Sequence, residues 1–168
     1  MKQIKRISAV IGLLSASLLM QGQNGTNYTK SRNYTAERTY IDTAAQAKYV
    51  SDIVYTDGFG REWQRIQVEA SPANGADLVT PYAYGTLGKV EREYLPFAKS
   101  GNNGTFDADM YLPERWNSYG VEEQAYAFTE TAYEASPLMR TASVTGAGKA
   151  WHTAGKSTTT EYGTNADG

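Results

Sequence analysis

The chain has 168 residues with 16 glycines, 13 tyrosines, no cysteine and a formal net charge of −2 at pH 7. The lack of cysteine excludes a disulfide framework and a cysteine metal site, and the mildly acidic balance argues against a nucleic-acid surface. Abundant tyrosine and glycine, against only four phenylalanines, are typical of a β-rich protein with many turns.

The N-terminal segment 1–23 has the pattern of a secretory signal peptide. Three basic residues stand in the first six positions, and an uncharged, largely apolar run follows from 7 to 20. Such a run is short for a membrane span and suits a signal sequence. We expect cleavage near Gln23 and a protein that is secreted or held at the cell surface. An uncleaved signal anchor is the alternative.

A polar leader follows, and after it one β-rich domain. Residues 24–38 contain almost no aliphatic side chains, which predicts a linker or an irregular leading strand. The domain is expected to span 39–168 and to continue beyond the end of this chain. Its first element is a possible short strand at 40–43.

The first clear structural signal is a β-hairpin. A strand-prone run at 49–56 enters Asp57-Gly58-Phe59-Gly60, and a second such run leaves from Arg61. We expect both glycines to supply positive φ angles, and the Asp57 side chain to bond to amides of its own turn. In the outgoing arm, the alternation puts Ile66 and Val68 on the apolar face and Trp63 on the polar one.

The hairpin phrase is repeated along the chain. Residues 81–90 align with it at an offset of 28, so that Phe59 matches Leu87, Gly60 matches Gly88 and Arg61 matches Lys89. A looser copy stands at 131–140, and a fourth begins at 160–165. Repeats of this kind indicate units that bury their apolar faces by stacking on their neighbours.

The remaining segments complete the expected fold. Pro81 is expected at an edge or a bulge because it cannot donate to a ladder. Residues 99–105 read as a flexible insertion, and Pro113 favours a short helix within 112–126. Trp151 to Gly163 is expected to end in a Thr-rich strand. The fold class is therefore mostly β, with antiparallel β-hairpin repeats and one short helical insertion at 112–126.

Four phrases in order also carry a family resemblance. They are Tyr-x-Asp-Gly-Phe-Gly-Arg at 55–61, Glu-Tyr-Leu-Pro-Phe at 93–97, Tyr-Glu-Ala-Ser-Pro-Leu at 133–138 and Glu-Tyr-Gly-Thr-Asn at 161–165. Together they resemble an uncharacterised domain near the N-terminus of large secreted bacterial proteins with Rhs repeats, whose usual motif is Tyr-x-Tyr-Asp-x-x-Gly-Arg. The second copy departs from that motif at Gly85 and Lys89, and the third lacks the glycine.

The resemblance implies a non-enzymatic, extracellular β module at the N-terminal side of a hollow repeat shell. Its partners would be further repeats of the same polypeptide or a C-terminal cargo domain such as a toxin. In the motif itself we expect glycines to allow the reversals, tyrosines to stack on the next unit, and basic residues to pair with an acidic turn residue or lie over a tyrosine ring. The structural motif residues are Tyr55, Asp57, Gly58, Gly60, Arg61, Tyr82, Tyr84, Gly88, Lys89, Tyr133, Pro137 and Arg140.

Two other functions compete with the structural one. A surface glycan could bind to exposed aromatic faces, with Trp63, Tyr111 and Trp116 as candidates. A hydrolase would need paired carboxylates across a cleft, for which the chain offers Glu91 with Glu93 and Glu122 with Glu123.

Neither a cofactor nor a metal is expected. Gly155-Lys156-Ser157 resembles the end of a phosphate-binding loop, but the first glycine of that motif is replaced by Ala150. His152 is the only histidine, and no metal-ligand spacing surrounds it. Both segments are therefore interpreted as structural.

Overall fold

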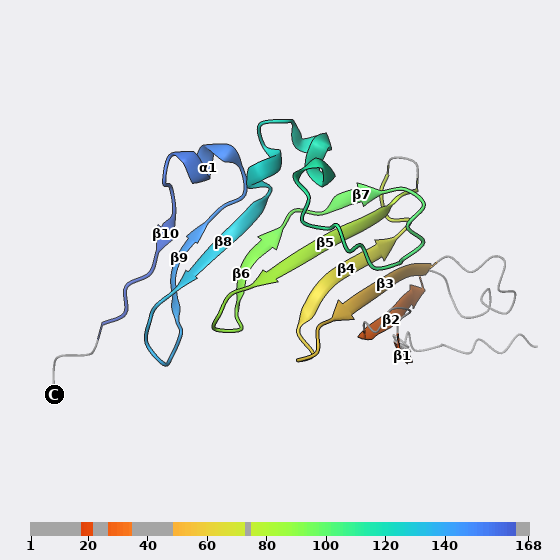
Figure 1. The fold of residues 1–168 in the computed structure, drawn as a ribbon, viewed down its shortest axis with the longest axis horizontal. Helices are drawn as coiled ribbons and strands as arrows, with labels where there is room; N and C mark the ends of the chain where they lie inside the picture. Colours follow the sequence, from red (N-terminus) through yellow and green to blue (C-terminus); the bar gives the residue numbers. More distant parts are fainter. Residues whose placement is uncertain (1–17, 22–26, 35–48, 73–74, 164–168) are drawn as a thin grey trace, which may run out of the picture.

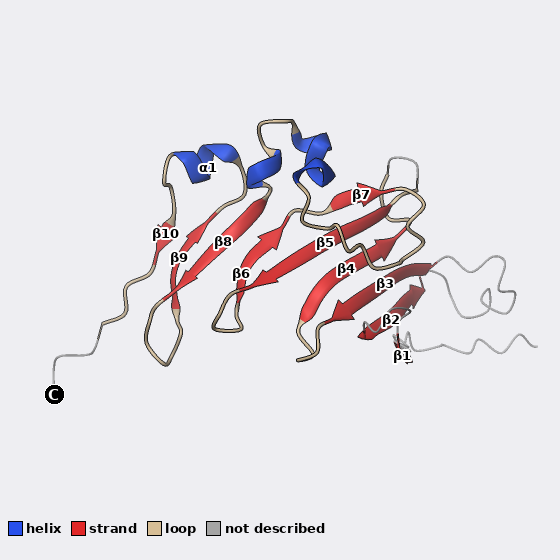
Figure 2. Cartoon of the chain, viewed as in Figure 1, coloured by secondary structure: helices blue, strands red, loops and turns tan. Residues whose placement is uncertain are grey.

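The computed structural model describes residues 18–21, 27–34, 49–72 and 75–163. Most of the predicted signal peptide and the possible strand at 40–43 lie outside these residues. Within them the predicted fold class is confirmed: the molecule is mostly β, with short helices only (Figure 2).

The strands form a single antiparallel sheet, seen in Figure 1 as a twisted array ordered β1-β2-β3-β4-β5-β6-β8-β9-β10, with β7 paired to β5. Their bounds are β1 Leu18–Gln21, β2 Asn27–Tyr34, β3 Tyr49–Thr56, β4 Glu62–Val68, β5 Asp77–Tyr84, β6 Val90–Tyr94, β7 Phe97–Lys99, β8 Phe128–Tyr133, β9 Thr141–Thr145 and β10 Thr158–Thr159. The helices are the 3₁₀ segments η2 Pro113–Tyr119 and η3 Gln124–Tyr126 and the short α1 Lys149–Thr153. The first two fall in the predicted helical insertion at 112–126, with Pro113 at the first turn.

The polar leader contains a regular strand. All eight residues of β2 pair with β3, so the strand alternative holds for 27–34 and the linker alternative is wrong there. On its other side β2 pairs with β1, which lies within the predicted signal peptide. Cleavage near Gln23 would therefore remove β1 and leave β2 at the edge of the sheet.

Each of the three hairpins contains a β-bulge in its outgoing strand. The register shifts place one extra residue two positions after the basic residue of the turn, namely Trp63, Glu91 and Ala142. A bulge breaks the two-residue alternation of a strand. This is why Trp63 does not follow its polar parity but packs beside the core, with its ring 5.2 Å from that of Phe106.

Pro81 is not at an edge, since it lies within the central strand β5 and is fully buried. On one side β5 pairs with β7 up to Val79 and with β6 from Tyr82 onward, so that β6 and β7 lie end to end beside it. Pro81 occupies the gap between these two ladders. On its other side Pro81 stands opposite Gln64 of β4. A residue without an amide N–H is tolerated at the gap because no strand residue is paired with it on that side.

The hydrophobic core lies between one face of β3–β5 and the segment 100–126, which runs over the upper part of that face in Figure 1. Trp116 anchors this cover segment: its side chain is 1% exposed, and its indole N–H donates to the Leu95 carbonyl over 2.7 Å. Each such buried side chain contributes about 1.5–3 kcal/mol. The core residues are Ile53, Tyr55, Ile66, Val79, Phe97, Met110, Trp116 and Ala127.

A buried polar cluster ties the cover segment to the sheet. The side chain of Gln64 is fully buried. Its Nε2 donates to the Asp107 carbonyl over 3.1 Å, and its Oε1 accepts from the backbone N–H of Asp107 over 2.9 Å. Asp77 accepts from the Gly104 amide over 2.6 Å, and the Tyr55 hydroxyl donates to the Gly104 carbonyl over 2.8 Å. The prediction of a flexible insertion at 99–105 is therefore wrong, because buried hydrogen bonds hold this loop against β3 and β5.

Candidate functional site

The first hairpin turn is built around Asp57. Its Oδ1 accepts from the amides of Phe59 and Arg61, each over 2.9 Å, and its Oδ2 lies 2.7 Å from Nε and 2.6 Å from Nη2 of Arg61. The predicted bonding of Asp57 to its own turn is confirmed. Gly60 has a φ of 77°, but Gly58 has no positive φ, so the expectation of two left-handed glycines is wrong for Gly58.

The second turn repeats the backbone pattern without the acid. Gly85 donates to the Lys89 carbonyl and Gly88, with a φ of 73°, donates to the Gly85 carbonyl, as Asp57 and Gly60 do in the first turn. The carboxylate of the bulged Glu91 occupies the space that a side chain at Gly85 would fill. Glu91 is therefore the acidic group nearest to the place held by Asp57 in the first turn.

The third turn is two residues longer and keeps the same plan. Glu134 donates its amide to the Arg140 carbonyl over 2.9 Å, and its carboxylate pairs with Arg140 Nε over 2.7 Å. Met139, with a φ of 47°, takes the place of the missing glycine. Pro137 lies exposed within the turn, between Glu134 and Arg140.

These turns are linked from hairpin to hairpin by one recurring contact. The cationic groups of Arg61, Lys89 and Arg140 lie 4.5, 5.2 and 4.0 Å from the ring centroids of Tyr84, Tyr133 and Tyr162, respectively. Each tyrosine hydroxyl then donates to the carbonyl of the residue that follows the cation, namely Glu62, Val90 and Thr141, over 2.6, 2.8 and 3.1 Å. We call this series the cation–tyrosine ladder.

The ladder confirms one part of the motif interpretation and corrects another. The predicted contacts of Arg61 with an acidic turn residue and with a tyrosine ring are both present, and Lys89 lies over a ring as expected. Tyr84 and Tyr133 each stand immediately before the first residue of their turn, where the first hairpin has Thr56. Tyr55 lies one residue earlier and belongs to the core instead, so its predicted role in stacking on the next unit is wrong.

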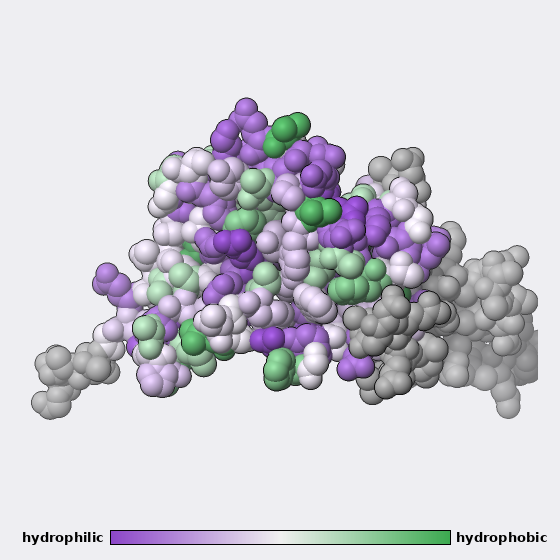
Figure 3. Space-filling view, in the orientation of Figure 1, coloured by the Kyte–Doolittle hydropathy of each residue, from purple (hydrophilic) through white to green (hydrophobic). Residues whose placement is uncertain are grey.

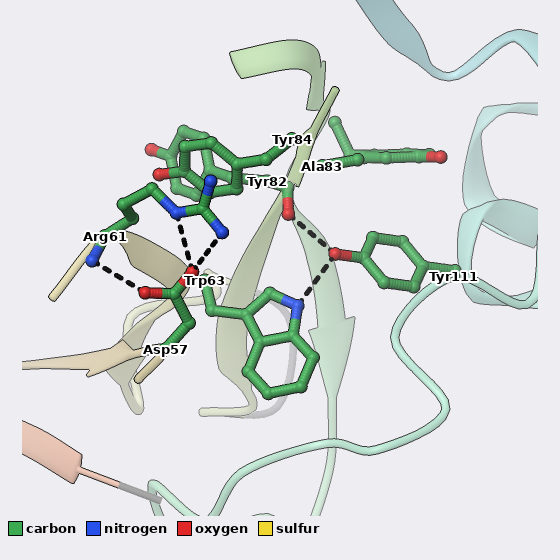
Figure 4. A pocket seen from close by; sticks show the side chains of 8 residues that line it. Asp57, Arg61, Trp63, Tyr82, Ala83, Tyr84 and Tyr111 are labelled. Atoms are coloured by element: carbon green, nitrogen blue, oxygen red, sulfur yellow. Dashed lines mark hydrogen bonds and ion pairs between the residues drawn. The ribbon is translucent and has the colours of Figure 1, made fainter. Parts of the chain in front are cut away.

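A pocket of about 450 Å³ opens beside the first rung of the ladder (Figure 4). The Tyr111 hydroxyl donates to the Tyr82 carbonyl over 2.6 Å and accepts from the Trp63 indole N–H over 3.1 Å. Trp63 and Tyr111, two of the three aromatic candidates, are thus brought together. The third, Trp116, is buried in the core and presents no exposed face. The pocket is lined by Asp57, Arg61, Trp63, Tyr82, Ala83, Tyr84, Tyr94 and Tyr111.

Burial and nearby charges shift the pKa values of four groups in the pocket, namely Asp57, Tyr82, Tyr84 and Tyr111. Burial raises the pKa of Tyr111 to about 12, and burial with the nearby Glu62 carboxylate raises the pKa values of Tyr82 and Tyr84. Burial also acts to raise the pKa of Asp57. Hydrogen bonds from the Arg61 amide and guanidinium and from the Phe59 amide outweigh that effect, so this pKa lies below its ordinary value.

Comparison with known proteins assigns this sequence to a family. The family model described as a domain of unknown function, DUF6443, matches residues 27–164. The chain belongs to the DUF6443 family. No curated protein and no solved structure matches it.

The other candidate groups of this DUF6443 domain are engaged in local structure. His152 lies in α1, with its ring 4.7 Å from that of Phe128 and its Nε2 3.1 Å from the Phe128 carbonyl. The segment Gly155-Lys156-Ser157 follows the C-terminus of α1. Gly155 has a φ of 61°, and the backbone N–H of Lys156 donates to the Trp151 carbonyl over 3.0 Å. This is the geometry of a helix C-cap.

The carboxylate pairs proposed for a hydrolase are also accounted for. Glu122 pairs with the Lys149 ammonium and Glu123 accepts from the Lys149 amide, while the bulge at Glu91 breaks the strand alternation between Glu91 and Glu93. Among the described residues of the DUF6443 domain, no group of three or more His, Asp or Glu side chains is arranged to hold a metal ion. None of the helices in that part of the chain has the length and apolar character needed to cross a bilayer.

Proposed function

We propose that this DUF6443 chain is a non-enzymatic structural module at the N-terminal side of a secreted Rhs-type repeat protein. Its role is to begin a sheet of hairpin units that later repeats extend towards a C-terminal cargo domain. The single observation that supports this most is the cation–tyrosine ladder, because its contacts run from each hairpin to the next.

The ladder suits extension because its rungs have a direction. Every hairpin turn offers a cation and the backbone carbonyl of the next residue, and the following unit needs only a tyrosine that reaches both. A cation–π contact contributes about 0.5–1 kcal/mol when exposed and the hydrogen bond about 1 kcal/mol, so one rung is modest alone and significant when repeated. Repeat proteins gain stability in this way, as a sum of the contacts between neighbouring repeats.

The last rung of the ladder makes the same contacts with a fourth unit. β10 pairs with β9 through Thr158 and Thr159, and Tyr162 lies under Arg140 with its hydroxyl on the Thr141 carbonyl. In the proposed protein the segment around Tyr162 is therefore the start of the next hairpin.

The proposal is tested by reading the gene beyond codon 168. We expect further hairpin phrases in which a tyrosine precedes the turn and a basic residue ends it. A stop codon directly after codon 168 in the intact gene would contradict the proposal.

Export is tested separately. We expect the protein recovered from the producing cell's exterior to begin near residue 24, as measured by intact mass. Retention of the full-length chain inside the cell would contradict the signal peptide and secretion together.

A further inference from the structure

The pocket at the first rung contains more aromatic surface than the ladder requires. A rung consists of one cation and one tyrosine. The bulge position that holds Trp63 in the first hairpin is occupied by Glu91 in the second and Ala142 in the third. The indole and the Tyr111 that bonds to it are therefore special to the first rung.

Four separate parts of the chain build this pocket. The first hairpin contributes Trp63 with the Asp57–Arg61 ion pair, and β5 and β6 contribute tyrosines. The cover segment contributes Tyr111, which comes from a position 48 residues away from its partner Trp63. In Figure 4 the Tyr111 hydroxyl points to the Trp63 indole N–H and the Tyr82 carbonyl, while the Arg61 guanidinium faces Asp57 beside the tyrosines of β5. The volume, about 450 Å³, lies within the roughly 300–1,000 Å³ range of small-molecule sites.

From this geometry we propose that the pocket binds a neutral pyranose ring of a glycan. A pyranose has faces of C–H groups that pack on aromatic rings, and hydroxyls at its rim that need both donors and acceptors. Five aromatic residues are among those that line the pocket, namely Trp63, Tyr82, Tyr84, Tyr94 and Tyr111. Beside them stands the Asp57–Arg61 ion pair, whose carboxylate is filled by the turn amides and by Arg61 Nε and Nη2. The guanidinium keeps N–H groups that Asp57 does not use, and these can donate to a sugar hydroxyl, while tyrosine hydroxyl oxygens can accept from one.

Charge selects a neutral sugar over other ligands. Asp57 and Arg61 are the only charged residues in the lining and they neutralise one another, so neither an anion nor a cation meets a net opposite charge. A purely apolar ligand would remove water from this ion pair without replacing its hydrogen bonds, which is unfavourable. A ligand with hydroxyls can replace that water.

The site is also organised before any ligand arrives. The Trp63–Tyr111–Tyr82 hydrogen bonds hold the side chains of Trp63 and Tyr111, and two contacts with Asp57 Oδ2 hold Arg61 over Tyr84. Side chains already fixed in their bound positions lose less conformational freedom on binding. The same arrangement would therefore serve the module as a surface for capturing glycan.

The test is saturation-transfer NMR on the full chain. The probes are methyl β-glucopyranoside, lactose, maltose, cellobiose and N,N′-diacetylchitobiose, and titrations follow for each sugar that binds. We expect at least one of them to receive saturation and to lose affinity at least tenfold in Trp63→Ala and in Tyr111→Ala. Trp151→Phe, which changes an exposed ring on α1 outside the pocket, should leave the affinity unchanged.

Should Trp63→Ala lose its fold, Trp63→Phe keeps an aromatic packed on Phe106 and should weaken binding less. Two results would overturn the proposal. One is the absence of saturation transfer to all five sugars in a folded wild-type chain. The other is binding that survives intact in folded Trp63 and Tyr111 variants. Neither result bears on the ladder, which is measured by stability.

Discussion

The guanidinium of Arg61 lies over the ring of Tyr84 at 4.5 Å, while the hydroxyl of the same tyrosine donates to the carbonyl of Glu62. Two consecutive residues of one hairpin therefore hold both the face and the tip of a side chain that belongs to the next. Because the arrangement recurs at Tyr133 and Tyr162, it joins units rather than stabilising one turn.

Removing only the hydroxyl isolates one part of the ladder. We expect Tyr84→Phe to lower the free energy of unfolding by about 0.5–1.5 kcal/mol, because the bond to the Glu62 carbonyl is lost within a half-buried contact. Tyr162→Phe should lower it less, since that ring is 44% exposed and water can replace the partner. Urea denaturation of both variants checks this, and an equal or reversed order would contradict it.

The two glycines of the first turn should respond differently to alanine. Gly60→Ala forces a side chain into the left-handed region and should destabilise the protein by about 1–2 kcal/mol. Gly58→Ala meets open space at an ordinary φ, so it should be neutral or stabilising by up to about 1 kcal/mol through a less flexible unfolded chain. The free energy of unfolding of both variants is measured by thermal or urea denaturation. A similar loss of stability in both would contradict the difference expected between Gly58 and Gly60.

Met139 offers the opposite substitution. It holds a φ of 47° at the position where the other two turns have glycine, so Met139→Gly should relieve strain and stabilise the protein by up to about 1 kcal/mol. The adjacent Leu138 is exposed and has no positive φ. Leu138→Gly is therefore the matched control and should be destabilising by about 0.5–1 kcal/mol. A destabilised Met139→Gly protein would mean that its side-chain packing outweighs the backbone strain.

Gln64 should be among the most sensitive positions. Gln64→Ala leaves the amide and the carbonyl of Asp107 buried without partners and should destabilise by about 2–4 kcal/mol. Hydrogen exchange in 100–112 should rise at the same time, because the cover segment loses its attachment to β4. Gln67→Ala, on the same strand, removes only a partly exposed bond to Asp52 and should stay within about 0.5 kcal/mol of wild type.

Acid should weaken the third hairpin through Glu134. Hydrogen bonds from Arg140 and Ser136 lower the pKa of Glu134 from 4.5 to about 2. A pKa lowered by folding means that the stabilisation is fully present above pH 4.5 and is lost as the pH falls towards 2. The stability difference between wild type and Glu134→Gln should therefore be largest above pH 5 and should shrink steadily as the pH falls through 2, as measured by denaturation across this range. A difference that does not change with pH would contradict the assignment to this carboxylate.

The apolar tips of the turns are the most exposed hydrophobic part of the repeat. Phe59, Leu87 and Leu138 each precede the residue with positive φ and are 86%, 53% and 68% exposed. On the face shown in Figure 3, hydrophobic residues form small separate patches among hydrophilic ones. The equivalence of the three tips follows from the repeat and not from a shared core.

Local chemistry made the hairpins readable from the sequence. Asp57, Gly60 and Gly88 act within four or five residues of themselves, so the turns, the strand pairs and the repeat could be predicted without knowing the rest of the fold. The cation over a tyrosine ring could also be anticipated, because the repeat sets both partners at matching positions.

Tertiary contacts decided the rest. A bulge moved Trp63 off its polar face, and the bonds of Gln64 to Asp107, 43 residues away, put a polar side chain in the core. The bonds of Asp77 and Tyr55 to Gly104 hold a glycine-rich loop that reads as flexible. Tyr111 reaches the pocket because Trp116 and the Gln64–Asp107 bonds hold its segment over the sheet. Periodicity records which neighbours a residue has along one strand. The periodicity of the sequence does not show which distant backbone groups will bond to a buried side-chain amide. Such distant contacts determined the core and the pocket.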